Sequence, residues 1–322
     1  MARPAPAQPP TRVIRMDSEL LFGTSPAMAK VLVACRKYAV AIAPVLILGD
    51  TGVGKTVLAR HLHALSGRSG AFDSQSLASI PEHLEASTLR GHTRGAFTGA
   101  DRDMPGIIEA ARGGTLLLDE IGLASPAIQQ VLLDLIEDRA VKRVGEVRAR
   151  PVDTWFIGAT NVDLTQAVAD GDFRRDLLAR FGYLRIHLPP LAERRDEILP
   201  LVRTNLARQS ARLAQPVPHL SKALEKLLLD APWRDNIRQV ESVCQHLVIH
   251  AELDRPLEPG DLPRDFLVEV GLTKELRVSR IGPETVRWAI KTHGGNRSQA
   301  ALTLGITRRH LQRLLARPRA SA

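Results

Sequence analysis

The first half of the chain alternates short apolar runs with amphipathic stretches. Residues 25–41 carry apolar side chains at helical spacing, and residues 44–48 form an apolar run ended by glycine, which is typical of a buried parallel strand. A helix is expected over about residues 55–65, and buried strands over 115–118 and 155–157. Strands and helices that alternate in this way favour an α/β fold, in which a doubly wound parallel sheet carries helices on both faces.

The pattern changes after Pro189-Pro190. The residues that follow have helical periodicity and no strand-like run, so they predict a small helical subdomain. We therefore expect a disordered tail over 1–20, an α/β core over 21–190, the helical subdomain over 191–264, a linker over 265–279 and an all-α domain over 280–322.

The positive charge of the chain gathers at its C-terminal end. The net charge is +9, and the residues from 277 onward hold ten basic side chains against the single acid Glu284. Such an excess is typical of a nucleic-acid-binding module, and the alternative is a solvated basic tail. No apolar run reaches the roughly 18 residues of a membrane span, and Cys35 and Cys244 are expected to be buried, reduced thiols of a cytoplasmic protein.

Residues 49–56 fit the G-x-x-x-x-G-K-[ST] pattern of a phosphate-binding loop. The pattern lies between an apolar strand and a helix, so that backbone N–H groups and the positive helix end both face an anion. Lys55 is expected to reach the β- and γ-phosphates of ATP, and the Thr56 hydroxyl to bind Mg²⁺. The predicted nucleotide-binding residues of this loop are Gly49, Asp50, Thr51, Gly52, Val53, Gly54, Lys55 and Thr56.

Two acids, Asp119 and Glu120, end the predicted strand over residues 115–118. Asp119 is expected to hold Mg²⁺ through water, and Glu120 to orient the attacking water as a general base. The alternative is an acidic pair that only caps the next helix. The phosphate-binding loop upstream favours the catalytic interpretation.

The hexapeptide Gly95-Ala-Phe-Thr-Gly-Ala100 lies between the phosphate-binding loop and the acidic pair, and it carries a family resemblance. It resembles the contact loop of sigma-54-dependent transcriptional activators, which are AAA+ ATPases with a helical lid that work as rings, usually hexamers. The resemblance implies that Phe97 and Thr98 touch sigma-54 when the nucleotide state raises the loop. The residues of this expected contact are Gly95, Ala96, Phe97, Thr98, Gly99 and Ala100.

Further segments carry the same resemblance. Thr160 and Asn161 look like the family's sensor I, which reads the γ-phosphate. Arg174 and Arg180 resemble the two arginine fingers, which reach the nucleotide of the neighbouring subunit, and Arg238 stands at sensor II as the expected phosphate contact. For each finger, the alternative is an ordinary surface charge on a helix.

Some positions depart from the family pattern. Ser76 stands where the family usually has an asparagine that hydrogen-bonds the catalytic glutamate. A hydroxyl has one donor and a shorter reach than an amide, so we expect this contact to be looser or lost. Thr56 replaces a common glutamate but restores the general loop pattern, and Arg234-Asp235 replaces the usual Pro-Gly.

The C-terminal residues predict a helix-turn-helix. Asn296 is placed to cap a helix, Gly305 gives the turn, and Thr307 is placed to cap a second helix. The segment resembles the Fis-type helix-turn-helix of the same family, and the alternative is a basic hairpin without a DNA role. The expected DNA-binding residues are Asn296, Arg297, Thr307, Arg308, Arg309, Gln312 and Arg313.

The motifs predict an ATPase, and the resemblance implies that it binds enhancer DNA, forms a ring and drives the Phe97 loop against sigma-54 RNA polymerase. About 20 residues precede the core, so control is expected from a regulator acting in trans or from a partner activator in a mixed ring. The rival interpretation is a non-catalytic DNA-binding regulator that keeps the ATPase fold as a scaffold. A general AAA+ remodeler would leave the basic tail unexplained.

Overall fold

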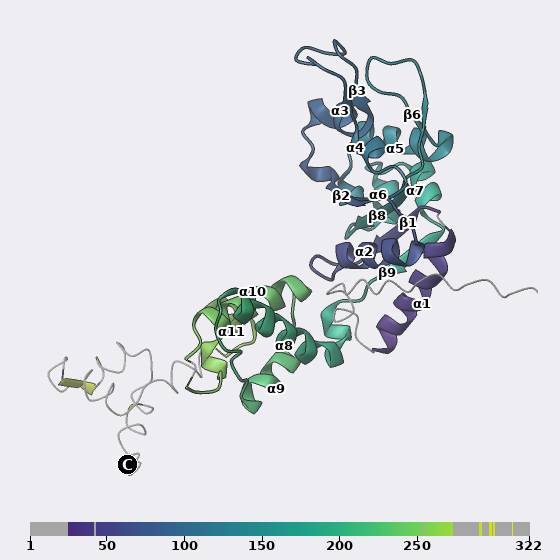
Figure 1. The fold of residues 1–322 in the computed structure, drawn as a ribbon. Coiled ribbons are helices and arrows are strands. Elements are labelled where there is room, and N and C mark those ends of the chain that lie inside the picture. The colour runs from purple at the N-terminus through teal and green to yellow at the C-terminus, as the bar shows by residue number, and fades with distance from the viewer. Residues whose placement is uncertain are drawn as a thin grey trace, which may run out of the picture. The chain divides into compact units, whose positions relative to one another are not determined.

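The computed structural model describes residues 25–41, 43–252 and 254–272, together with residues 290, 291, 296, 297, 299 and 311 (Figure 1). The described residues fall into two compact units. Unit 1 holds those up to Thr204 and takes in Trp233–Val240 from further along the chain. Unit 2 holds Asn205–Pro232 and the residues from Glu241 on. The domain boundaries drawn from the sequence stay predictions.

Unit 1 is built on a parallel sheet with the strand order β2-β5-β8-β1-β9. Its strands are β1 (Val45–Leu48), β2 (Phe72–Ser76), β5 (Thr115–Asp119), β8 (Trp155–Thr160) and β9 (Leu184–His187). Its helices are α1 (Pro26–Ala41), α2 (Lys55–Ser66), α3 (Glu85–Arg90), α4 (Ile107–Ala110), α5 (Pro126–Asp138), α6 (Leu164–Asp170) and α7 (Arg175–Phe181). Short 3-10 helices cover Leu77–Ser79, Glu82–Leu84, Ile121–Leu123 and Leu191–Glu193.

The two faces of the sheet bury separate apolar clusters. In β1, Leu46 belongs to one cluster, whereas Val45 and Ile47 belong to the other, because successive side chains of a strand point to opposite faces. Helices α5 and α7 contribute to the first cluster, and α1 and α2 to the second. A strand covered on both faces has no polar side, so the predicted strands read as continuous apolar runs. The predicted α/β fold is confirmed.

The sheet also contains two edge strands, β2 and β9, that the hydrophobic pattern does not predict. Strand β2 pairs only with β5 and reads Phe-Asp-Ser-Gln-Ser, and β9 pairs only with β1 and reads Leu-Arg-Ile-His. An edge strand is partly exposed and tolerates polar side chains. Its position is decided by pairing with a neighbour rather than by its own pattern.

Two short hairpins lie at one end of unit 1 (Figure 1). Strand β3 (Gly91–His92) pairs with β4 (Met104–Pro105), and β6 (Ala140–Val141) pairs with β7 (Arg150–Pro151). The first hairpin carries the predicted contact loop. The backbone of Val144 joins the two hairpins, since it accepts from the N–H of Thr93 at 3.0 Å and donates to the carbonyl of Gly91 at 2.9 Å.

The helical periodicity predicted after Pro190 is confirmed. Helices α8 (Arg195–Arg212) and α10 (Asn236–Ile249) each begin in unit 1 and continue in unit 2, which also holds α9 (Lys222–Asp230) and α11 (Arg264–Glu269). The hydroxyl of Ser221 caps α9 by accepting from the N–H of Leu224 at 3.2 Å. A 3-10 helix covers Pro259–Asp261.

Both cysteines are buried, as expected. Cys35 lies in α1 and Cys244 in α10, and burial raises the pKa of each thiol to about 12. Thiols of this kind stay protonated at neutral pH. None of the described helices has the length and apolarity needed to cross a membrane.

Candidate functional site

The predicted phosphate-binding loop, residues 49–56, forms a tight turn between β1 and α2. Gly52 and Gly54 have φ values of +75° and +104°, which residues with a Cβ rarely adopt. A Cβ on Gly52 would lie 2.2 Å from the carbonyl oxygen of Asp235. This glycine therefore also allows a close approach by another backbone segment.

Lys55 begins α2, and its Nζ donates to two carbonyl oxygens of the loop at 2.8 and 3.0 Å. Burial lowers the pKa of Lys55, and Asp119 and Asp50 oppose this shift by raising it. Arg238 lowers the same pKa and Glu120 raises it, both through their charges. The structure thus brings these predicted site residues together around one ammonium group.

Asp119 and Glu120 stand where β5 ends, next to the end of β2. Ser76 pairs with Asp119 in the sheet register, and its hydroxyl donates to Oε2 of Glu120 at 2.5 Å. The expectation that serine loosens or loses this contact was wrong, because strand pairing brings the short side chain within reach of the carboxylate. Glu120 has a φ of +57°, and its N–H donates to Oδ1 of Asp119 at 3.0 Å. Strained backbone of this kind is typical of functional positions.

The predicted sensor I residues lie at the end of β8, which pairs with β1: Thr160 is its last residue, and Asn161 follows it. The N–H of Gly49 donates to the carbonyl oxygen of Thr160 at 3.3 Å, and Nδ2 of Asn161 donates to Oγ1 of Thr51 at 3.4 Å. The side chain of Thr160 is buried and its Oγ1 accepts from the N–H of Val162 at 3.0 Å. Both residues therefore contact the phosphate-binding loop, Thr160 at Gly49 and Asn161 at Thr51.

Asn236 ties the phosphate-binding loop to a distant part of unit 1, and sequence reasoning missed it. Its Nδ2 donates to the carbonyl of Thr51 at 3.0 Å, and its Oδ1 accepts from the N–H of Leu191 at 2.7 Å. The next residue adds a bond, since the N–H of Ile237 donates to the carbonyl of Gly52 at 2.9 Å. Asn236 has a φ of +53°, and asparagine tolerates this region better than most residues.

We expect the substitution Asn236→Ala to lower the free energy of unfolding by about 1–3 kcal/mol, because it leaves the buried N–H of Leu191 without a partner. Asn236 is 1% exposed and Leu191 is fully buried, so water does not replace the bond between them. Denaturant unfolding followed by circular dichroism measures the change. Thr165→Ala, at an exposed position, is the control. A loss no larger than that of the control would contradict the structural role.

Arg174 stands at the N-cap position of α7 and is exposed. Its guanidinium pairs with Asp176 at 3.0 and 2.8 Å and donates from Nη1 to Oε1 of Gln130 at 2.7 Å. The hydrogen bond with Arg174 is the main reason why the pKa of Asp176 falls to about 2. The backbone N–H of Arg174 donates to Oε1 of Gln129, a side chain that is 1% exposed.

Arg180 lies in the last turn of α7 and is also exposed. Its Nη2 lies 2.7 Å from Oε1 of Glu137 on α5. The side-chain contacts of both arginines that the structure describes are with α5 and α7 rather than with the phosphate-binding loop. Neither residue is placed by these contacts at the nucleotide site of its own subunit.

The predicted sigma-54 contact loop turns back on itself. The N–H of Gly95 donates to the carbonyl of Ala100 at 2.8 Å, and the N–H of Ala100 donates to the carbonyl of Phe97 at 3.0 Å. The ring of Phe97 is 39% exposed and meets the ring of His92 edge-on, with 5.0 Å between centroids. Thr98 is exposed beside it. The loop thus presents one aromatic and one hydroxyl side chain to solvent.

Of the predicted DNA-binding residues, the structure describes Asn296 and Arg297. Oδ1 of Asn296 accepts from the N–H of Gln299 at 3.2 Å, which is the bond expected of a helix N-cap. The remaining predicted residues lie outside the described residues, and they are Thr307, Arg308, Arg309, Gln312 and Arg313.

The donor set at the phosphate-binding loop fits Mg²⁺. Across the described residues, no group of three or more His, Cys, Asp or Glu side chains is arranged to hold a metal ion on its own. Mg²⁺ is usually held by one or two protein oxygens together with substrate phosphates and water. The Thr56 hydroxyl and the Asp119 carboxylate match this chemistry.

A strand, a glycine-rich loop with Lys55, a strand-end acidic pair and a helical region define an AAA+ nucleotide-binding protein. Comparison with protein families agrees. The Sigma-54 interaction domain matches residues 21–187, the AAA+ ATPase lid domain matches 192–276, and the Fis family of bacterial regulatory proteins matches 287–317. The chain belongs to the sigma-54-dependent transcriptional activators, with a Fis-type DNA-binding helix-turn-helix.

Known relatives and solved structures support this membership. The chain is 37% identical to the transcriptional regulatory protein ZraR of Salmonella typhi, over 92% of the chain and 68% of that protein. It is 38% identical to the pathogenicity locus regulatory protein HrpS of Pseudomonas syringae pv. syringae, over 84% and 87%. The structure of NtrX from Brucella abortus in complex with ATP matches with a TM-score of 0.69 and 28% identity, over 91% of this chain and 68% of NtrX.

Proposed function

We propose that this protein is an ATP-driven activator that binds enhancer DNA, assembles into a ring and remodels sigma-54 RNA polymerase at the closed promoter. The observation that carries the proposal is the phosphate-binding loop, whose carbonyl oxygens accept from Lys55 at the start of α2, with Asp119, Glu120 and Arg238 near enough for their charges to shift the pKa of Lys55. This site lies in the same unit as an exposed sigma-54 contact loop. The ATP-bound structure of NtrX supports ATP as the substrate.

The residues divide the work of hydrolysis. The N–H groups of the phosphate-binding loop and the Lys55 ammonium hold the phosphates of ATP. Thr56 and Asp119 would hold Mg²⁺, which when bound neutralises charge that develops on the phosphate oxygens. Glu120 orients a water molecule for in-line attack and takes its proton. Thr160, Asn161 and Arg238 would then respond to the γ-phosphate.

The placement of the two arginines supports a ring. Both are exposed, and their ion pairs with Asp176 and Glu137 hold them on the surface of α7, where each would face the nucleotide of a neighbouring subunit. Arg174 adds its charge to the γ-phosphate in this arrangement, and Arg180 adds a second charge. A ring of one kind of subunit, or a mixed ring with a partner activator, satisfies this geometry. A regulator acting in trans would then set the activity.

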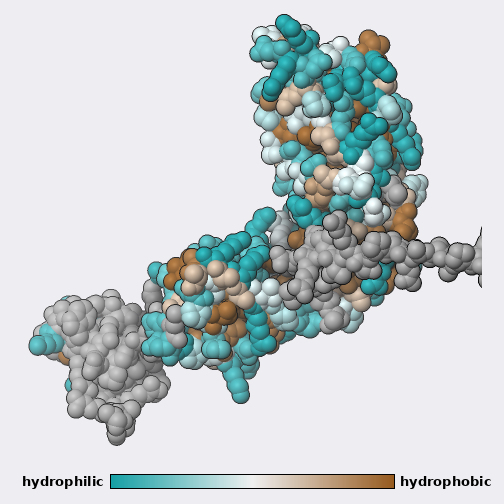
Figure 2. All heavy atoms as spheres, in the orientation of Figure 1, coloured by the Kyte–Doolittle hydropathy of each residue, from teal (hydrophilic) through white to brown (hydrophobic). Residues whose placement is uncertain are grey.

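The contact loop would transmit the effect of ATP hydrolysis to sigma-54. Phe97, Met104 and Val147 are exposed apolar side chains on the two loops joined by Val144, with exposed fractions of 39%, 50% and 93%. Figure 2 shows that this end of unit 1 is mostly hydrophilic with isolated apolar spots. A small apolar tip on a polar surface suits a transient protein contact. We propose that it meets sigma-54, and that residues 296–313 hold DNA.

The turnover of ATP per subunit, measured over a range of protein concentrations, tests this function. We expect turnover to rise with concentration as rings form, and Lys55→Ala to abolish turnover while DNA binding is kept. Open-complex formation on a sigma-54 promoter should require the same residue. Transcription activation that persists in Lys55→Ala would instead favour the non-catalytic scaffold.

The Ser76–Glu120 hydrogen bond would restrain the general base and so lower the basal turnover of ATP. The hydroxyl occupies an oxygen of the general base, so Ser76→Ala should raise the basal turnover of ATP by about tenfold, the equivalent of 1.4 kcal/mol. Steady-state turnover without polymerase measures the effect. Ser79→Ala is the matched control, because its hydroxyl contacts the Ser76 carbonyl and not the carboxylate of Glu120. An unchanged or lower turnover in Ser76→Ala would contradict the restraint.

The substitution Phe97→Ala should separate hydrolysis from output. We expect turnover of ATP to stay near that of the unmodified chain, and open-complex formation to fall by about 10- to 100-fold through loss of one apolar anchor. Potassium permanganate footprinting on a sigma-54 promoter measures opening. Val40→Ala, an exposed apolar residue of α1, serves as the control. If Phe97→Ala opens promoters as well as the control does, the loop is not the contact.

A further inference from the structure

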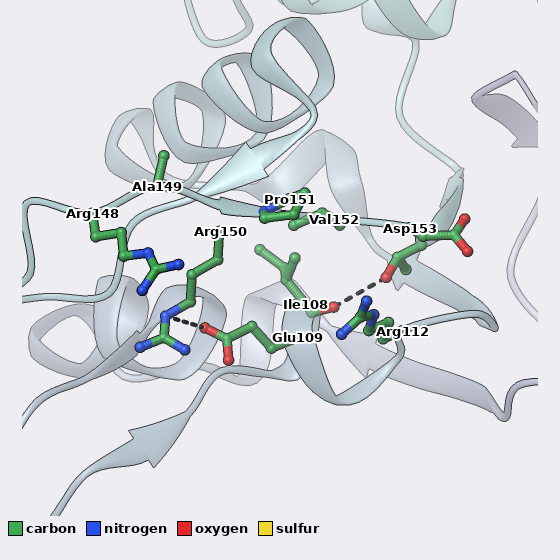
Figure 3. Close-up of a pocket in the computed structure, with 10 residues that line it drawn as sticks. Ile108, Glu109, Arg112, Arg148, Ala149, Arg150, Pro151, Val152 and Asp153 are labelled. Carbon is green, nitrogen blue, oxygen red and sulfur yellow. Dashed lines mark hydrogen bonds and ion pairs between the residues drawn. The ribbon is translucent and has the colours of Figure 1, made fainter.

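A second pocket lies in unit 1, away from the phosphate-binding loop (Figure 3). It has a volume of about 340 Å³ and is lined by α4, by Arg112 just after it and by residues 148–154, which include β7 and end where β8 begins. Because the sheet is parallel, the start of β8 lies at the edge opposite to the end of β1, where the phosphate-binding loop begins. The pocket is therefore separate from the nucleotide site.

Charged side chains dominate the lining, and the two acids among them are already neutralised from outside. Glu109 accepts from Nε and Nη2 of Arg143 at 2.9 and 2.6 Å. Oδ1 of Asp153 lies 2.6 Å from Nη2 of Arg68. Neither Arg143 nor Arg68 lines the pocket. Arg143 and Arg68 thus balance most of the negative charge that faces the pocket, and Arg150 adds a longer contact, with its Nε 3.9 Å from Oε1 of Glu109.

Among the side chains that line the pocket, three arginines stand against two acids. Arg150 is bidentate with Glu146, at 3.0 and 2.9 Å. Within the part of the chain that the structure describes, Arg112 and Arg148 form no ion pair and no side-chain hydrogen bond. The hydrogen bond with Arg150 lowers the pKa of Glu146 most, and the charge of Arg148 lowers it further, which places Arg148 near this pair. Figure 3 shows Arg148 and Arg112 on opposite sides of the pocket, with Arg150 and Glu109 between them.

We propose that this pocket binds a small phosphate-bearing anion through Arg112 and Arg148, with Arg150 at its edge. A guanidinium presents two parallel N–H donors that match two phosphate oxygens, and several such groups together favour phosphate strongly. The volume lies at the lower end of the range for small-molecule sites, roughly 300–1,000 Å³.

The pocket is positioned to act on the contact loop. Arg148 and Arg150 belong to the segment that also contains Val144, whose backbone bonds hold Gly91 and Thr93 at the start of the contact hairpin. An anion that draws the two arginines into the pocket would restrain this segment and with it the base of the contact loop. This regulatory role rests on the proposed function, whereas the binding itself does not.

Isothermal titration with inorganic pyrophosphate tests the binding. The full chain carries Lys55→Ala throughout, so that the phosphate-binding loop contributes little and equally to every measurement. We expect saturable binding at one further site per chain, and a loss of affinity of at least about tenfold when Arg112→Ala and Arg148→Ala are added. Arg36→Ala, at an exposed arginine of α1, is the matched control and should bind like the parent.

These titrations decide whether the pocket binds phosphate. The proposal is overturned if pyrophosphate shows no saturable binding, or if the chain with Arg112→Ala and Arg148→Ala binds as tightly as the Arg36→Ala control. Melting curves by circular dichroism show that each variant is folded. If short duplex DNA displaces pyrophosphate from the parent, the phosphate belongs to a nucleic-acid backbone, and if it does not, the ligand is a free anion. Both of these last results support the pocket. Because no turnover is measured, failure here leaves the proposed ATPase function untouched.

Discussion

Replacing Arg174 with alanine should lower the turnover of ATP per subunit by about 10³- to 10⁵-fold, the range for an arginine finger in phosphoryl transfer. The structure supports so large an effect because this side chain is pre-positioned. Asp176 and Gln130 hold its guanidinium, and the buried amide of Gln129 fixes its backbone. Steady-state turnover at a concentration where rings are complete measures the loss.

Arg175→Ala is the matched control, because the neighbouring arginine is also exposed and should leave turnover nearly unchanged. A mixture of two inactive variants gives the sharper test. In a mixed ring, a Glu120→Gln subunit still presents Arg174 to an Arg174→Ala neighbour, whose own general base is intact. We therefore expect mixing to restore turnover. If mixing restores nothing, or if Arg174→Ala works as well as Arg175→Ala, Arg174 does not act across subunits.

The second large effect is expected for Glu120→Gln. Turnover should fall by about 10²- to 10⁴-fold, because an amide keeps the shape of the side chain but cannot take a proton from water. Nucleotide affinity should stay close to that of the unmodified chain, since Lys55 and the loop N–H groups are untouched. Turnover and equilibrium binding of a fluorescent ATP analogue together separate the two effects.

Glu82→Gln removes an exposed carboxylate elsewhere in unit 1 and should alter neither quantity. Loss of nucleotide binding in Glu120→Gln would point to a structural role for the strained backbone at this position. Turnover that survives the substitution would assign the general base to another group and would remove the main support for Glu120 as the catalytic residue.

Much of the candidate site was predictable because its chemistry is local. The phosphate-binding loop needs glycines and a lysine at set spacing within one strand–loop–helix unit, and all of these lie within residues 45–56. Asp119 directly follows the most apolar part of β5, so a strand-end position could be inferred from the run alone. The same holds for Asn296, whose capping role depends on the N–H three residues later.

The contact between Ser76 and Glu120 was predicted wrongly for a physical reason. The short reach and single donor of serine argue against the contact only while the pairing of β2 is unknown. Strand β2 is polar and has no hydrophobic pattern that would reveal this pairing. Pairing with β5 places Ser76 beside Asp119, and this closeness compensates for the short side chain. The missed role of Asn236 has a similar origin, since its partners lie 185 and 45 positions away in the chain.

By itself, the sequence determined which groups the protein uses and which local elements carry them, because helical spacing, buried strands and loop motifs depend on neighbours in the chain. Only the tertiary structure decided how separate segments meet. It placed Asn236 against the phosphate-binding loop and left Arg112 and Arg148 unpaired around a pocket while Arg143 and Arg68 neutralised its acids. Such pairings depend on strand order and packing between distant residues, which no local pattern encodes.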